Sequence, residues 1–161
     1  MLEPAKDLFA DRRRRLMERM GDGAAAVFFS APEAVRSNDT HYEYRQNSDL
    51  WYLTGFEEPE SALVLRPGHA EHPVVLFVRK RDKEREVWDG PRAGVEGAKE
   101  RFGANEAFLV EELDAKLPGL LEGSDRLYYG LGLYPDRDRH LIAALVRARV
   151  ASNKPGGTGG G

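Results

Sequence analysis

Two apolar runs joined by a short connection constrain the fold more than any other feature of this sequence. Ser61–Leu65 is followed by the turn-forming stretch Arg66–His72, which begins Arg-Pro-Gly, and then by Val74–Val78. Because so short a connection has no room for a crossover helix, the two runs are predicted to be neighbouring antiparallel strands. A third run, Ala24–Ser30, is apolar almost throughout, which is typical of a central strand covered on both faces.

The rest of the chain alternates between helical and strand-like patterns. Helices are predicted at Pro4–Met20, Gly94–Phe102, Val110–Leu121 (with Pro118 truncating or kinking it) and Tyr134–Val150. Strands are predicted at Leu50–Thr54 and Arg126–Gly130. No element is predicted for the charged stretch Arg79–Glu86 or for the turn that follows it. Together these patterns predict an α/β domain with a mixed β-sheet flanked by helices.

Length and composition narrow the class of protein. The 161 residues fit one domain, predicted over residues 1–150, with a Gly-rich linker or chain end over residues 151–161. A net charge of −3 argues against bulk binding to nucleic acid or anionic membranes. The absence of cysteine excludes disulfides and thiolate chemistry. With no membrane-length apolar run and no signal-peptide layout at the N-terminus, a cytoplasmic location is expected.

The sequence contains no self-contained catalytic motif. It lacks a Gly-rich phosphate loop, a dinucleotide fingerprint, the H-E-x-x-H zinc pattern and a nucleophile elbow. The best metal candidate is Asp39, His41 and Glu43, whose alternation would place all three on one side of an extended segment. The alternative, which we favour, is a polar loop whose carboxylates pair with Arg36 and Arg45.

Two further features each admit two interpretations. The basic run Arg12–Arg15 is expected to be a solvated helix face or a subunit contact, and less readily a phosphate contact. Trp88 is followed by Asp-Gly-Pro-Arg, a turn sequence that would hold the indole at an edge, where it could act as a binding anchor. A buried core position for Trp88 is equally compatible with the pattern.

The segment Glu33–Asp49 is long and polar for a connection inside a compact domain, and such loops are often functional. Its last part, Arg45–Asp49, stands directly before the apolar run Leu50–Thr54. Polar groups in that position must find hydrogen-bond partners if they are buried. The juxtaposition therefore predicts an ordered polar network at the mouth of a strand.

The string Arg36-Ser-x-Asp39-x-x-Tyr42-x-Tyr44-Arg-Gln-Asn-Ser-Asp49-x-Trp51-Tyr-x-Thr-Gly55-Phe-x-Glu58-Pro-Glu60 closely resembles the N-terminal domain of bacterial Xaa-Pro aminopeptidases. The resemblance continues through Leu63-Val-Leu65, Arg79-x-Arg81-Asp82 and Val87-Trp88-Asp-Gly-Pro-Arg92, and covers roughly residues 8 to 150. Creatinase and prolidase carry a similar N-terminal fold with a looser motif.

The resemblance implies an N-terminal unit with a ribonuclease-H-like fold, followed in the parent by a pita-bread catalytic domain that holds two manganese ions. That catalytic domain releases an N-terminal residue that precedes proline, and none of it lies in this chain. No catalytic residue, metal ligand or cofactor is therefore assigned here, and the chain alone is expected to be inactive.

By the same resemblance, Asp39 and Trp88 are expected to line the substrate pocket or a subunit interface, with Tyr42, Arg45 and Asn47 supporting the loop. The implied partners are the catalytic domain of the same chain, further copies in a dimer or tetramer, and peptides with proline second. The alternative function is a stand-alone peptide-binding module that uses the Arg36–Asp49 loop and Trp88. A nuclease is disfavoured, because no strand carries the spaced carboxylates that two metals would need.

Overall fold

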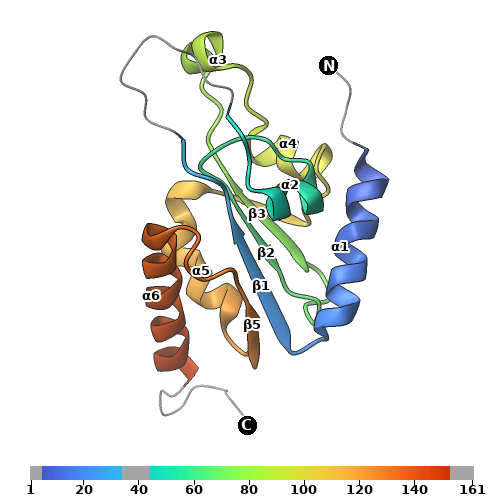
Figure 1. Ribbon diagram of the computed structural model, residues 1–161, viewed down its shortest axis with the longest axis vertical. Coiled ribbons are helices and arrows are strands. Elements are labelled where there is room, and N and C mark those ends of the chain that lie inside the picture. Colours follow the sequence, from blue (N-terminus) through green and yellow to red (C-terminus); the bar gives the residue numbers. More distant parts are fainter. Residues whose placement is uncertain (1–4, 34–43, 153–161) are drawn as a thin grey trace.

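The computed structural model describes residues 5–33 and 44–152, which form a five-stranded sheet with helices on both faces (Figure 1). The strands are β1 (Ala24–Phe29), β2 (Ala62–Leu65), β3 (Val74–Val78), β4 (Glu106–Leu109) and β5 (Arg126–Tyr128). Their order across the sheet is β4-β3-β2-β1-β5. The observed architecture confirms the predicted α/β class with a mixed sheet.

The three central strands are antiparallel and the two edge strands are parallel to their neighbours. Strand β2 pairs antiparallel with both β1 and β3, and Leu65 lies opposite Val74 at the hairpin. Strand β5 runs parallel to β1, and β4 runs parallel to β3. Helices lie between the members of each parallel pair in the sequence, as parallel neighbours require. The prediction of a hairpin between the second and third strands is confirmed.

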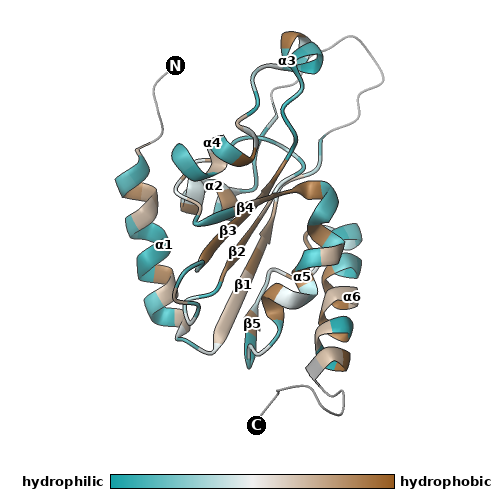
Figure 2. Ribbon diagram, turned by 180° about the vertical axis from the view of Figure 1, so that it is seen from behind, coloured by the Kyte–Doolittle hydropathy of each residue, from teal (hydrophilic) through white to brown (hydrophobic). Residues whose placement is uncertain are grey.

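Each face of the sheet is covered by its own helices. One face, which includes Leu63 and Leu76, packs in one apolar cluster with residues of α1 (Lys6–Met20), α2 (Ser48–Thr54) and α4 (Gly94–Glu100). The other face, which includes Val64 and Phe77, packs against α5 (Leu113–Leu121) and α6 (Pro135–Ser152). Figure 2 shows the hydrophobic strands lying between these helices. Burial on both faces explains why β1, β2 and β3 are apolar without alternation.

Helix α5 continues through Pro118, and the carbonyl that loses its backbone donor there has another hydrogen-bond partner. A residue at position 118 would normally donate its backbone N–H to the carbonyl oxygen of Asp114. In this helix the Asp114 carbonyl accepts a hydrogen bond of 3.3 Å from Nη1 of Arg147, on α6. A short 3₁₀ turn at Val110–Glu112 precedes the helix. The predicted helix over 110–121 is thus present, with its first turn wound more tightly.

The prediction of a strand over Leu50–Thr54 is wrong, because the segment forms helix α2. The Asn47 side chain caps the helix by accepting hydrogen bonds from the backbone of Asp49 and Leu50, each 3.0 Å long. Gly55 ends it in the left-handed conformation at φ 71°, and a Cβ there would lie 2.6 Å from the Phe9 ring. Two aromatic residues that suggested a strand, Trp51 and Tyr52, are exposed on the outer side of this helix.

Two elements lie where no element was predicted, namely β4 and the helix α3 (Lys83–Asp89). Helix α3 has no buried residue, so it carries no apolar stripe from which a helix could be inferred. It lies beyond the ends of the strands, away from both helical layers (Figure 1). No helix in the described part of the chain is long and apolar enough to cross a membrane.

The basic run Arg12–Arg15 divides between the interior and the surface, so its prediction as a solvated face is correct for only part of it. Arg13 is 3% exposed and donates a hydrogen bond of 2.8 Å to the carbonyl of Leu53. Burial lowers the pKa of its guanidinium. Arg12 lies over the ring of Tyr52, with 4.2 Å between its guanidinium carbon and the ring centre. Arg14 and Arg15 are exposed as predicted.

Candidate functional site

A buried glutamine organises the polar segment that precedes α2. The Gln46 residue is 8% exposed. Its Oε1 accepts hydrogen bonds from the backbone N–H of Ala31 (3.1 Å) and of Asn47 (2.9 Å). The Tyr44 hydroxyl lies 2.9 Å from the same oxygen and 2.5 Å from the carbonyl of Ala31. This acceptor side of Gln46 fixes the polar segment to the end of β1. The predicted ordered polar network is present, but it leads into helix α2 and not into a strand.

The Tyr44 hydroxyl in this network is partly shielded from water. Burial raises the pKa of the Tyr44 hydroxyl to about 12, because the phenolate would lose its hydration. The hydroxyl therefore stays protonated at any physiological pH. It serves as a hydrogen-bonding group and is not available as an acid or base.

The donor side of Gln46 fixes the loop that leads into β2. Its Nε2 donates to the carbonyls of Phe56 (3.2 Å) and Glu58 (2.9 Å). The same Glu58 carbonyl accepts a bond of 2.9 Å from the Ser61 hydroxyl. The Ser61 backbone N–H in turn donates to the Ser30 hydroxyl oxygen at 3.0 Å, at the end of β1. Because each buried polar group finds a partner, the network can lie at the sheet without a large desolvation cost.

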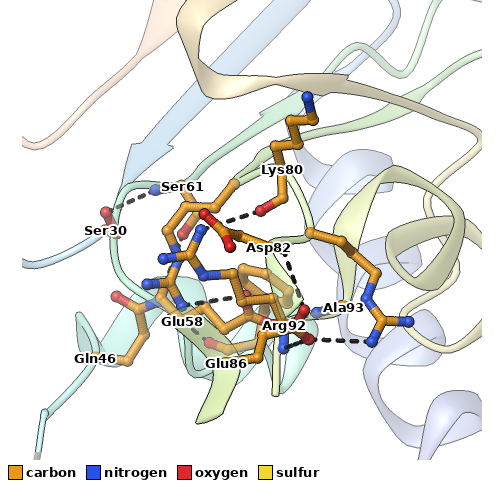
Figure 3. Close-up of polar contacts among 12 residues, drawn as sticks. Ser30, Gln46, Glu58, Ser61, Lys80, Asp82, Glu86, Arg92 and Ala93 are labelled. Atoms are coloured by element: carbon orange, nitrogen blue, oxygen red, sulfur yellow. Dashed lines mark hydrogen bonds and ion pairs between the residues drawn. The ribbon is translucent and has the colours of Figure 1, made fainter. Parts of the chain in front are cut away.

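The side chain of Glu58 connects this network to a second region, residues 79–93, which we call the arm. Helix α3 forms its outer part. The Glu58 side chain is 16% exposed, and its Oε1 lies 3.4 Å from Nη2 of Arg79 at the start of the arm. Its Oε2 accepts a hydrogen bond of 2.9 Å from the Ala93 backbone at the end of the arm. One carboxylate thus holds the two ends of the arm together (Figure 3).

A second carboxylate closes the arm further out. The Glu86 side chain accepts hydrogen bonds from the backbone N–H of Arg92 (2.8 Å) and of Asp82 (3.1 Å), and from Nη2 of Arg81 (3.1 Å). The hydrogen bond from Arg92, aided by the charge and hydrogen bond of Arg81, holds the pKa of the Glu86 carboxyl below its ordinary value. Both oxygens of Glu86 are engaged, so this carboxylate is structural and is poorly placed to act as a base.

Trp88 is the most exposed large apolar residue of the described chain, at 88%, and Val87 beside it is 79% exposed. Both lie on α3. Exposed aromatic side chains held on an ordered element are typical of binding anchors. Trp88 is therefore not a core residue of the described part of the chain. Its role as a binding anchor stays a prediction.

The other predicted site residues lie apart from Trp88 or outside the described residues. Asn47 caps α2 and also donates from Nδ2 to the Tyr134 hydroxyl at 2.9 Å, just before α6. Arg45 is exposed and lines a surface groove of about 920 Å³ with the aromatic residues Trp51 and Tyr52. Asp39 and Tyr42 lie outside the described residues, as do Arg36, His41 and Glu43, so their predicted roles stay predictions.

Sequence reasoning missed the three residues that organise the site, Gln46, Glu58 and Glu86. A signal existed for Gln46, because it stands in the middle of a polar run directly before a buried segment. Glu58 stood in the family motif, but no role was assigned to it, and Glu86 gave no signal. Each stands among other charged residues typical of a solvated surface. Within residues 5–33 and 44–152, no three histidine or carboxylate side chains gather to hold a metal ion.

The fold and the site together define a class of protein: a mixed-sheet α/β domain with a buried polar network that leads to a projecting arm. The family model described as "Aminopeptidase P, N-terminal domain" matches residues 9–128. The chain belongs to this family, and the resemblance inferred from its motifs is confirmed.

Individual relatives agree with this assignment. The chain is 43% identical to the Xaa-Pro aminopeptidase of Escherichia coli over 155 residues, which is 96% of this chain and 35% of that protein. It is similar in structure to Pseudomonas aeruginosa aminopeptidase PepP, with a TM-score of 0.86 and 45% identity over 96% of this chain and 36% of that one. A structure of "Zn substituted E. coli Aminopeptidase P in complex with product" matches with a TM-score of 0.85 and 42% identity, covering 94% of this chain and 34% of that one. The chain thus spans about a third of the length of these relatives.

Proposed function

We propose that this chain is the N-terminal domain of a cytoplasmic, proline-specific metalloaminopeptidase, which releases the N-terminal residue before proline. In this proposal the domain serves subunit assembly and access to the active site, and it carries no catalytic group. The family membership and the Xaa-Pro aminopeptidase relatives support it. In this proposal the manganese ions of the parent are held by its catalytic domain, outside the third of such a protein that this chain spans.

The observation that carries this proposal is the exposed Trp88 on an arm whose backbone is fixed at both ends. An ordered element that exposes two adjacent apolar side chains is suited to insertion into another surface. We propose that this surface is the rim of the substrate pocket, in the same polypeptide or in a neighbouring copy within a dimer or tetramer. Trp88 would then contact the peptide end, and the face of an indole is well suited to pack against the apolar pyrrolidine ring of proline.

The proposed role of Trp88 is tested by substituting it in the complete enzyme. Trp88→Ala should lower kcat/KM for an Xaa-Pro peptide by about tenfold, the effect of losing one aromatic contact. Glu84→Gln, an exposed change on the same helix, is the matched control and should leave kcat/KM unchanged. Unaltered kcat/KM in Trp88→Ala would show that the arm does not take part in substrate binding.

The absence of catalysis in this chain is tested directly with the purified protein. The 161-residue chain with added Mn²⁺ should not hydrolyse a peptide of the Arg-Pro-Pro type, whereas the complete enzyme should. Measurable turnover by the chain itself, rising with its concentration and lost with a chelator, would contradict the proposal.

A second candidate function is a stand-alone peptide-binding module, favoured by the groove beside Arg45 and by the exposed indole. Titrating Pro-containing peptides into the chain while recording tryptophan fluorescence separates the two. A saturable change that disappears in Asp39→Ala would support the module. A flat response would leave assembly and pocket access as the function.

A further inference from the structure

We propose that Glu86 is the positioning residue for Trp88: its carboxylate closes the arm and so presents the indole in one fixed orientation. The inference rests on the proposed role of Trp88 in the parent enzyme, and it names the group on which that role depends. Glu86 itself reaches no substrate in this scheme, because its oxygens face the backbone of the arm.

Helix α3 needs an explanation for its stability, since burial does not supply one. It has seven residues and none of them is buried. Helices this short are marginal in water, and in proteins they are usually held by an apolar face packed on the core. The order of α3 must therefore come from polar contacts at its ends and at its base.

The contacts of Glu86 meet this requirement. Its side chain is only 9% exposed, although it lies on an otherwise exposed helix. The bonds from Asp82 and Arg92 join residues ten positions apart in the chain, one before the helix and one after it. Bonds to a charged acceptor are stronger than bonds between neutral groups. The carboxylate therefore ties the entry of the arm to its exit.

Two further contacts extend this closure to the body of the domain. Nη1 of Arg92 donates to the carbonyl of Lys80 at 3.0 Å, again joining the two sides of the arm. Below it, Glu58 joins Arg79 to Ala93. Figure 3 shows Glu58, Glu86 and Arg92 in one cluster of polar contacts. Glu86 is the outermost closure of this series and lies only two residues from Trp88.

Fixing the arm has a direct consequence for recognition. A binding group that is already ordered loses less conformational entropy on association than a mobile one. If Glu86 no longer closes the arm, Trp88 keeps its chemistry but samples many orientations. The cost then falls on substrate binding, so KM should rise while kcat changes less.

The structural half of the inference is tested on the chain itself by amide hydrogen exchange. Glu86→Gln preserves the shape of the side chain but replaces one of its two accepting oxygens with an N–H donor. Exchange across residues 82–92 should become at least about tenfold faster, while the sheet keeps its protection. Glu84→Gln is the matched control and should leave the arm unchanged. Equal exchange in the wild type and Glu86→Gln would overturn the inference.

The functional half is tested by a double-mutant cycle in the complete enzyme. Glu86→Gln and Trp88→Ala should each raise KM several-fold, and the double variant should be no worse than Trp88→Ala alone. A purely structural role for Glu86 predicts instead that the two losses multiply, and that result would refute the positioning role. Thermal unfolding of Glu86→Gln monitors whether the sheet is intact.

The two proposals fail in different ways. If Trp88→Ala leaves KM and kcat unchanged, the proposed function of Trp88 is wrong, whereas the exchange experiment still decides whether Glu86 closes the arm. If Trp88→Ala raises KM but Glu86→Gln changes neither KM nor the exchange of the arm, the positioning role alone is wrong.

Discussion

The sheet and the arm are stabilised by opposite means. In β3, Leu76 is fully buried between two strands and the helices on its face. In the arm, Val87 is 79% exposed, and the chain is ordered by hydrogen bonds to Glu58 and Glu86. The same kind of side chain thus supports the fold in one region and is left free for contact in the other.

This difference shows how a small domain can expose apolar groups on an ordered element. Hydrophobic burial orders a chain only by hiding its apolar side chains, so it cannot also present them. Hydrogen bonds to a shielded carboxylate order the backbone and leave the apolar side chains outside. The arm can therefore carry Trp88 and Val87 at the surface without collapsing onto the sheet.

The largest expected effect is the loss of stability on truncating a buried apolar residue of the sheet, compared with truncating an exposed one of the arm. Leu76→Ala should lower the free energy of unfolding by about 4 kcal/mol, because it removes buried methyl groups and leaves a cavity. Val87→Ala should change it by less than about 0.5 kcal/mol. Urea denaturation followed by circular dichroism measures both. A comparable loss in the two variants would show that the arm also depends on burial.

The second prediction tests whether the polar network around Gln46 contributes to the stability of the whole fold, as the buried sheet does. The Gln46 side chain has five hydrogen-bonding partners, and Gln46→Ala leaves buried backbone groups unpaired. We expect a loss of about 3 kcal/mol in the free energy of unfolding. Arg45→Ala, at the exposed neighbouring position, is the control for the denaturation experiment. If both variants unfold at the same urea concentration, the network contributes little.

A smaller effect is expected at the start of α2. Asn47→Ala removes the helix cap and the bond to Tyr134, and should cost about 1 kcal/mol. Tyr134→Phe removes only the hydrogen bond that Asn47 donates to the Tyr134 hydroxyl, and it should cost about half as much. Thermal unfolding of both variants separates the cap from the contact with the α6 region. Equal losses would mean that the cap is energetically silent.

The smallest effect is confined to the arm and depends on pH. Because the pKa of Glu86 is lowered in the folded arm, its carboxylate stabilises closure above its ordinary pKa of 4.5. That stabilisation is lost as the pH falls through the lowered pKa of the folded arm. The indole N–H signal of Trp88 should therefore broaden or shift at acidic pH, before the signals of the sheet change. In Glu86→Gln the same signal should show no such transition.

Much of the fold could be predicted from the sequence because it follows from local patterns. The short connection between Leu65 and Val74 required a hairpin, and the continuous apolar runs required cover on both faces. The error at Leu50–Thr54 has a physical cause. Its aromatic residues favoured a strand. In the structure the Asn47 side chain caps the start of a helix, and Gly55, in the left-handed conformation, ends it.

The candidate site was less predictable than the fold. Trp88 was identified from the turn that follows it, and Asn47 from the motif. The roles of Glu58 and Glu86 depend on backbone donors that lie 35 and six residues away, at Ala93 and Arg92. No local pattern marks such pairs, because an acidic residue in a charged stretch looks the same whether it faces water or a backbone N–H.

By itself, the sequence determined the class of the fold, the central hairpin, the absence of thiol chemistry and the family motif. These depend on residue type and spacing, which act locally. The tertiary structure alone decided that the aromatic run is a helix, that Gln46 is buried, and that two carboxylates close an arm which carries Trp88. Those features depend on which groups meet after folding, and burial turns an ordinary polar side chain into a structural one only where its partners are already in place.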